Sequence, residues 1–226
     1  MPGKPEIRHF SDLLCVWAYV AHVRLEELAH RYGDQVAISL HFCPVFPDAH
    51  GKIETAWKTR GGFEGYGAHV AHVAAGFDHV SVHPDVWQKV RPRSSGAAHL
   101  FLRAVALADE AQGRLIDSAL YRASWALRRA FFAEARDISE WREQAAVAET
   151  LGLDIGAIEG ALRSGAAMAA LEADIRFCEQ NHITGSPTFR MNEGRQILYG
   201  NVGFHLIEAN VKELLRRPAR DEASWC

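Results

Sequence analysis

The pattern of apolar and polar residues predicts a strand, a long helix and a second strand at the start of the chain. Residues 6–10 alternate between polar and apolar side chains, as a half-buried strand does. Apolar residues then recur at helical spacing over 17–32, and Gly33 supplies a stop. Residues 36–42 have one strongly apolar side and predict the next strand. This order predicts a right-handed parallel unit.

The middle of the chain divides into an irregular part and a helical part. Glycines and prolines interrupt residues 49–93 repeatedly, and we expect one helical piece there, over 65–75. A long irregular segment of this kind often forms a lid or a binding loop. Residues 94–180 have helical periodicity almost throughout, with Asp154 as a candidate N-cap.

The pattern returns to strands near the end of the chain. Short strands are predicted over 188–191 and 196–199, with a hairpin at Glu193–Gly194 and an amphipathic helix through 206–214. Two strands therefore precede the helical block and two follow it. We expect an α/β fold with a large all-helical insertion. Its discontinuous core comprises residues 1–48 and 183–226, and its insertion domain comprises residues 49–182, with the irregular loop region at 49–93.

Composition narrows the classes of partner. The chain has 226 residues, of which 48% are hydrophobic and 23% are charged, as in an ordinary globular protein. The net charge of −3 gives no electrostatic case for nucleic acid or an anionic membrane as a partner. No apolar run approaches the roughly 20 residues that span a bilayer.

The first five residues lead directly into the first predicted strand, so we expect no signal peptide and a cytoplasmic location. Thiols stay largely reduced in that compartment. The four cysteines, at positions 15, 43, 178 and 226, show neither metal-ligand spacing nor a disulfide framework. His69 and His72 have helical spacing but no accompanying acidic or cysteine ligand, so we expect pocket-lining or solvent-facing histidines and no metal.

Cys15 is the leading candidate for chemistry. It falls at or just before the first turn of the predicted helix, where unpaired N–H groups and the positive end of the helix dipole favour an anion. A thiol in this position is expected to favour the thiolate, which is the nucleophilic form. A reactive cysteine before a helix usually belongs to a Cys-x-x-Cys motif. Here the position of the second cysteine is taken by Ala18. We expect Trp17 and Tyr19 to pack in the core or in a pocket wall.

A second stretch, residues 181–194, reads as a helix end, a turn at Ser186-Pro187 and a strand that starts at Thr188. Three further motifs, taken together with this stretch, occur in the order that is found in one known family. The motifs are Asp12-x-x-Cys15-x-Trp17, Ser94-Ser95-Gly96-Ala97-Ala98-His99 and Phe131-Phe132-Ala133-Glu134-Ala135-Arg136-Asp137-Ile138. In this order they resemble the DsbA-like thioredoxin family. The similarity is closest to its cytosolic branch of 2-hydroxychromene-2-carboxylate isomerases, kappa-class glutathione transferases and related oxidoreductases.

The resemblance implies a thioredoxin-like fold and a cis bond at Pro187, opposite Cys15. The backbone of Ser186 would then pair with a peptide or with glutathione like an added strand. The expected substrate- or glutathione-binding residues are Ser11, Trp17, Ala18, Ser186, Pro187 and Thr188. Glutathione is the expected co-substrate.

The reaction stays open at this point, because the oxidoreductases have a second cysteine at position 18 and many isomerases and transferases have serine at position 15. The first hypothesis is a monothiol thiol–disulfide oxidoreductase that acts with glutathione on a small-molecule or protein disulfide. The second is a glutathione-dependent isomerase or transferase for a small aromatic or electrophilic substrate. The third is a redox-inert binding module. The sequence leaves both a monomer and a homodimer open.

Two further groups have alternative interpretations. Cys43 follows the second parallel strand, at the same sheet edge as Cys15, so it either resolves a disulfide on Cys15 or is a small buried apolar residue. Cys178 is expected in a helix core. Arg128 and Arg129 either meet a substrate carboxylate or lie on a solvated helix face.

Overall fold

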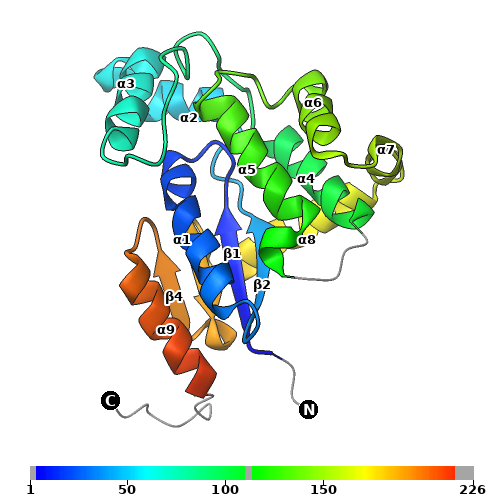
Figure 1. The fold of residues 1–226 in the computed structure, drawn as a ribbon. Helices are drawn as coiled ribbons and strands as arrows, with labels where there is room; N and C mark the ends of the chain where they lie inside the picture. The colour runs from blue at the N-terminus through cyan, green and yellow to red at the C-terminus, as the bar shows by residue number, and fades with distance from the viewer. Residues whose placement is uncertain (1–3, 110–113, 217–226) are drawn as a thin grey trace.

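A four-stranded sheet lies at the centre of the computed structural model, which describes residues 4–109 and 114–216 (Figure 1). Its strands are β1 (Glu6–Ser11), β2 (Ala37–Phe42), β3 (Thr188–Met191) and β4 (Gln196–Tyr199). The order across the sheet is β2-β1-β3-β4, with β1 parallel to β2 and antiparallel to β3. The four predicted strands are therefore confirmed. Because β1 and β2 are parallel, the segments that follow them start at the same edge of the sheet.

Helices cover both faces of this sheet. Helices α1 (Val16–Tyr32) and α9 (Phe204–Arg216) pack on one face through a shared cluster that includes Ile7, Leu28 and Val211 (Figure 1). Helix α8 (Ala166–Gln180) packs on the other face, where Cys178 joins Phe10 in a smaller cluster. Cys178 is 3% exposed, which confirms its expected place in a helix core.

The other helices of the long insertion all lie between β2 and α8 in the sequence. They are α2 (Ala49–Ala56), α3 (Gly62–Ala74), α4 (Gly96–Ala108), α5 (Ala119–Phe132), α6 (Trp141–Leu151) and α7 (Ile155–Arg163). The helical character of 94–180 is confirmed, since none of its described residues belongs to a strand. Asp154 caps α7 as predicted, because its side chain accepts a hydrogen bond from Ala157 N.

The helical piece predicted over 65–75 is confirmed by α3, whereas α2 in the same irregular segment was not predicted. The side chain of Asp48 caps α2 by accepting a hydrogen bond from Gly51 N at 3.0 Å, and Ile53 buries its apolar side. Gly61 and Gly62 both have positive φ and form the turn into α3 rather than interrupting a helix. In Figure 1, α2 and α3 lie above the beginning of α1.

One large hydrophobic cluster joins the inserted helices to the N-terminal part of α1. It contains Leu14 and Tyr19 from the β1–α1 region together with Phe46, Phe101 and Phe131. Tyr19 stacks on Phe132 with ring centroids 4.7 Å apart. The start of α1 is therefore held between the sheet and the inserted helices.

Asp174 of α8 links the inserted helices to the edge strand of the sheet. Its carboxylate accepts hydrogen bonds from Phe42 N at 3.0 Å and from Arg103 Nε at 2.7 Å, and it lies 2.8 Å from His41 Nδ1. Burial alone would raise the pKa of Asp174, but His41, the charge of Arg103 and the Phe42 N–H together hold that pKa below its usual value. The ionised carboxylate is therefore part of the folded structure.

Replacing Asp174 with asparagine should lower the free energy of unfolding at neutral pH by about 3 kcal/mol, because Arg103 then stays buried without its anion. The pKa of Asp174 is lower in the folded than in the unfolded state. Its contribution is therefore complete above the unfolded pKa and disappears as pH falls through the folded one. The stabilities of the wild type and Asp174→Asn, from urea titrations, should therefore begin to converge as pH falls below about 4 and should meet only below the lowered folded pKa.

The matched control for this experiment is Glu172→Gln, which neutralises an exposed carboxylate on the same helix. It should change stability by less than about 0.5 kcal/mol at any pH. An equal loss in both variants would show that Asp174 contributes only through net charge.

Candidate active site

Cys15 occupies the N-cap position of α1 and faces the loop before β3. Its backbone is extended, with φ −84° and ψ 114°, and its side chain is 7% exposed. The thiol Sγ donates a hydrogen bond to the carbonyl oxygen of Ser186 at 3.2 Å. The Ser186–Pro187 peptide bond is cis, the geometry that the resemblance implies. The fold thus brings together the two stretches singled out in the sequence, which lie more than 170 residues apart.

The expectation that Cys15 favours the thiolate is wrong for this arrangement. Burial is the largest effect and raises the pKa of the Cys15 thiol, and the nearby Asp12 carboxylate also raises it. Hydrogen bonds from the Ser186 side chain and from the Ala18 and Trp17 N–H groups lower this pKa. The helix terminus does supply donors for a sulfur anion. Burial outweighs them, so the resting group is a thiol that donates to Ser186.

The other predicted binding residues lie around this contact. The Ser186 hydroxyl accepts a hydrogen bond from Asp12 N at 2.9 Å, and Thr188 donates through Oγ1 to Gly185 O at 2.9 Å. Ser11 lies at the end of β1, and Pro187 is buried beside Ser186. The loop before β3 is therefore held by Asp12 of the β1–α1 connection and by Thr188 at the start of β3.

Residues 17–19 differ in their surroundings. Ala18 and Tyr19 are both 2% exposed, so Tyr19 packs in the core as expected. Trp17 is 37% exposed, which excludes the core for this residue and leaves the pocket wall as its predicted place. Position 17 points to solvent from the first turn of α1, which leaves a large aromatic surface beside Cys15.

Asp12 was part of a motif in the sequence but was given no role there. Its carboxylate is fully buried and accepts four hydrogen bonds. The donors are Leu14 N at 2.8 Å, Val45 N at 3.0 Å, Phe46 N at 2.9 Å and Ser95 Oγ at 2.7 Å. These donors come from three separate segments of the chain. Asp12 therefore fixes the loop that ends in Cys15 against the segment after β2 and the start of α4.

His99 completes the same layer from α4. Its Nε2 accepts a hydrogen bond from Leu13 N at 3.2 Å and lies 3.9 Å from Asp12 Oδ1, while its ring stacks on Phe42. Burial lowers the pKa of His99, although the charge of Asp12 acts in the opposite direction. A neutral ring can accept from Leu13 N, so the Ser94–His99 motif serves to position the Cys15 loop.

Two further residues lie near Cys15: Tyr66, which no sequence pattern indicated, and Arg128, for which either a substrate carboxylate or a solvated helix face was expected. Tyr66 of α3 is 8% exposed, and burial together with the neighbouring Cys15 and Asp12 raises the pKa of its phenol. Arg128 of α5 is buried and donates from Nη2 to Ser11 Oγ at 2.7 Å. Its position one turn after Ser124, on the apolar side of α5, was the available signal.

The solvated-face interpretation is therefore wrong for Arg128, whereas Arg129 is exposed as that interpretation expects. The two adjacent arginines lie in opposite environments because consecutive residues on a helix point about 100° apart.

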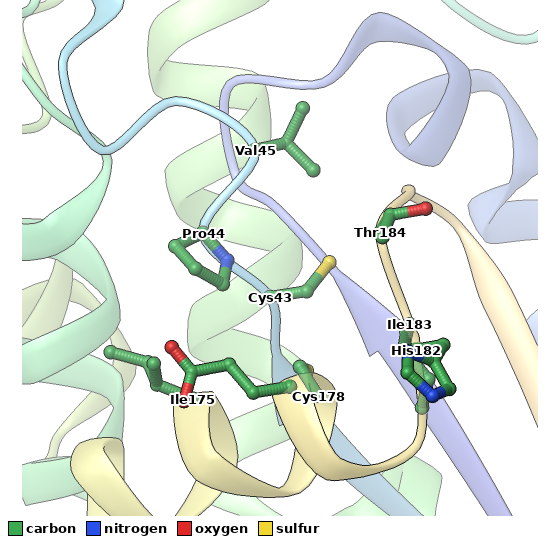
Figure 2. Close-up of a pocket in the computed structure, with 9 residues that line it drawn as sticks. Cys43, Pro44, Val45, Ile175, Cys178, His182, Ile183 and Thr184 are labelled. Carbon is green, nitrogen blue, oxygen red and sulfur yellow. The ribbon is translucent and has the colours of Figure 1, made fainter.

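Cys43 contacts the same loop before β3 that Cys15 contacts. Its Sγ is 3.6 Å from Gly185 O, so Cys15 and Cys43 contact successive carbonyl groups of that loop. Burial raises the pKa of Cys43, which disfavours its thiolate. Figure 2 shows the Cys43 sulfur turned toward the segment that carries Thr184. The pocket drawn there has a volume of 310 Å³ and is also lined by Cys178, Glu179 and His182.

The predicted histidine pair has an ordinary packing environment. His69 lies against Trp57 with ring centroids 5.0 Å apart. Across residues 4–109 and 114–216, no group of three or more histidine, cysteine or acidic side chains is arranged to hold a metal ion. Cys226 lies outside the described residues. None of the described helices combines the length and the apolar character needed to cross a membrane.

Comparisons with known proteins decide the family. A family model for the DSBA-like thioredoxin domain matches residues 6–212. The chain belongs to the DSBA-like thioredoxin family. A search of curated proteins with the sequence found no match. Membership in this family accounts for the thioredoxin-like fold.

Solved structures with the same DSBA-like fold include oxidoreductases and an isomerase. A probable DsbA oxidoreductase from Streptomyces coelicolor has a TM-score of 0.73 and 16% identity, covering 98% of this chain and 94% of its own. The cytosolic disulfide reductase DsbM from Pseudomonas aeruginosa, solved with GSH, has a TM-score of 0.64 and 19% identity. The match covers 92% of this chain and 99% of the DsbM chain. A 2-hydroxychromene-2-carboxylate isomerase has a TM-score of 0.61 and 19% identity, and the match covers 96% of this chain and 100% of the isomerase chain.

Removing the carboxylate of Asp12 should destabilise this site strongly. Asp12→Ala leaves four donors without their acceptor, and we expect the free energy of unfolding to fall by about 3 kcal/mol. Ser95→Ala removes one donor and leaves the carboxylate with three, so it should cost about 1 kcal/mol. Equal losses in the two variants, measured by urea denaturation, would contradict the central role of Asp12.

Proposed function

We propose that this protein is a glutathione-linked thiol–disulfide oxidoreductase with Cys15 as its single active-site cysteine. The observation that carries the proposal is the contact of the Cys15 thiol, at the start of α1, with the Ser186 carbonyl at 3.2 Å. One turn later, where a second thiol would stand, the residue is Ala18. The family and the reductase and oxidoreductase neighbours support thiol–disulfide chemistry.

The chemistry follows from that single thiol. The Cys15 thiolate attacks one sulfur of a disulfide, a mixed disulfide forms, and the other sulfur leaves as a thiolate. Since Ala18 has no thiol, an outside thiolate must attack the mixed disulfide and return Cys15 to its reduced form. Glutathione suits this role in the cytoplasm, where we place the protein, and the neighbouring reductase DsbM was solved with GSH.

Ser186 couples this chemistry to binding. Its carbonyl oxygen accepts from the Cys15 thiol in the reduced protein. A mixed disulfide on Cys15 has no S–H group, so that oxygen becomes available to an N–H group of glutathione or of an extended peptide. Ser11, Trp17, Ala18, Pro187 and Thr188 are the proposed surroundings of the bound molecule, with Trp17 offering exposed aromatic surface.

A glutathione-dependent isomerase or transferase is the second candidate, and one observation favours it. Burial keeps Cys15 in the thiol form, which donates a hydrogen bond rather than attacking. In this alternative the site binds glutathione and activates the glutathione thiol for a small aromatic or electrophilic substrate. The isomerase neighbour has this fold.

Incubation with oxidised glutathione tests the first candidate. Intact-mass measurement should find one glutathione adduct on the wild type, an unchanged adduct on Cys43→Ala, and no adduct on Cys15→Ser. Loss of the adduct in Cys43→Ala would instead make Cys43 the reactive thiol. Tight binding of reduced glutathione without an adduct would favour the isomerase or transferase. If the protein forms no adduct and does not bind reduced glutathione, the redox-inert binding module is favoured.

Restoring the second thiol should change how the protein resolves a disulfide. Ala18 N donates to Cys15 O at 3.1 Å, so Ala18→Cys places a thiol one helical turn from Cys15. Attack within the site then gains from proximity. We expect a disulfide between Cys15 and the introduced cysteine by non-reducing peptide mapping, and reduction of a model disulfide that no longer needs added glutathione. Glutathione-independent turnover by the wild type would contradict the monothiol mechanism.

A further inference from the structure

Arg128 is a buried cation without a matching acid. Its side chain is 2% exposed and donates from Nη2 to the neutral hydroxyl of Ser11 at 2.7 Å. Within residues 4–109 and 114–216, no carboxylate lies within ion-pair distance of this guanidinium. Burying an unpaired charge is strongly unfavourable. Asp12 acts on Arg128 only as a nearby charge, so among the described residues this cation has no anion paired with it directly.

The groups beside Arg128 do not supply that anion. The buried atoms His9 Nδ1, His22 Nε2, Ser124 Oγ and Arg128 Nε itself have no hydrogen-bond partner. Burial, helped by the charge of Arg128, lowers the pKa of His9 to about 3 and that of His22 well below its usual value. Both histidines are therefore neutral, and Arg128 is the fixed positive charge at the centre of this polar cluster.

The groups whose charge favours the protonated guanidinium are Cys15, Asp12, Tyr121 and Cys43. Burial lowers the pKa of Arg128 to about 10, which still leaves it charged at neutral pH. Asp12 already has four hydrogen-bond donors, and burial raises the pKa values of Tyr121 and Cys43, which keeps both neutral. The remaining acid is the thiol of Cys15, which becomes an anion during disulfide exchange.

We propose that Arg128 is a positioning residue whose buried guanidinium, held by Ser11 at the end of β1, stabilises the thiolate of Cys15 each time that thiolate forms. This inference rests on the proposed function. Ser11 and Cys15 belong to the same short connection between β1 and α1, so the bond from Arg128 to Ser11 fixes the charge relative to the sulfur.

The step that benefits most is the release of Cys15 from its mixed disulfide with glutathione. An incoming glutathione thiolate attacks the glutathione sulfur, a new disulfide forms between the two glutathione molecules, and the bond to Cys15 breaks. The electron pair of that bond stays on the Cys15 sulfur. A disulfide sulfur leaves faster when its thiol has a lower pKa, so a nearby cation accelerates this step.

The pH dependence of alkylation tests the proposal without glutathione. Iodoacetamide would be applied to the wild type and to Arg128→Met, with Cys15 modification followed by peptide mass. The titratable groups that also face this region, and that the variants leave in place, are Asp12, Cys43, Tyr66, His99, Tyr121 and histidines 9 and 22.

In Arg128→Met the alkylation midpoint should move upward by about one pH unit, which is about a tenfold loss of thiolate at neutral pH. The alkylation rate should fall only about threefold, because a more basic thiolate is also a better nucleophile. Arg128→Lys, which keeps the charge, should restore most of the wild-type profile. Arg129→Met is the matched control: it removes the adjacent exposed charge on the same helix and should leave the midpoint unchanged.

An unchanged midpoint in folded Arg128→Met overturns the inference, as does an equal shift in Arg129→Met. If Arg128→Met does not fold, Ser11→Ala serves as the second variant. It frees the guanidinium from its one bonded partner and should raise the midpoint by a smaller amount, and an unchanged midpoint there also overturns the inference. Alkylation reports Cys15 directly, so a shifted midpoint without any glutathione adduct would reject the proposed function and leave the role of Arg128 standing.

Discussion

The buried carboxylate of Asp12 is the constraint on which the rest of this site depends. A carboxylate with no exposure is tolerable only when strong donors surround it, and here four donors do so from three segments of the chain. Each segment can satisfy Asp12 only in its native place. The β1–α1 turn, the chain after β2 and the start of α4 are therefore fixed together. Since α4 belongs to the inserted helices, these helices help to position Cys15 as well as to cover it.

The same arrangement sets two opposing effects on the Cys15 sulfur. Burial and the charge of Asp12 favour the thiol, whereas the helix N–H groups and the Ser186 side chain favour the thiolate. The balance lies with the thiol, which uses its proton to satisfy the Ser186 carbonyl. Forming a thiolate or a disulfide removes that donor. Under the proposed function, the redox state of this sulfur therefore decides whether the Ser186 carbonyl is free to accept from a bound molecule, which couples recognition to chemistry.

Local periodicity was enough to predict the strands and the helical block, because each of these elements repeats its apolar side at a fixed spacing. It was insufficient for α2, whose short length gives little periodicity and whose main signal was the cap at Asp48. The resemblance placed Cys15 and Ser186, but local patterns say little about which polar residues are buried: Arg128 lies on the apolar side of its helix, whereas nothing local marks Asp12. Asp12 and Arg128 gain their roles from segments far away in the sequence. The exposure of Trp17 and the pKa of Cys15 likewise depend on packing, so the sequence could not decide between core and pocket wall for Trp17, and the expected thiolate of Cys15 was wrong.

Under the proposed function, a single buried thiol also changes which property of the site limits exchange. In a dithiol site the second cysteine is always present, so release of the substrate does not depend on access from solvent. Here Ala18 is packed in the core and an outside thiol must reach a sulfur that is 7% exposed. The lifetime of a mixed disulfide is then set by two terms, the approach of the outside thiol and the ease with which the Cys15 thiolate leaves. The inserted helices over α1 restrict the approach of the outside thiol. The hydrogen-bond donors at the start of α1 stabilise the Cys15 thiolate as it leaves.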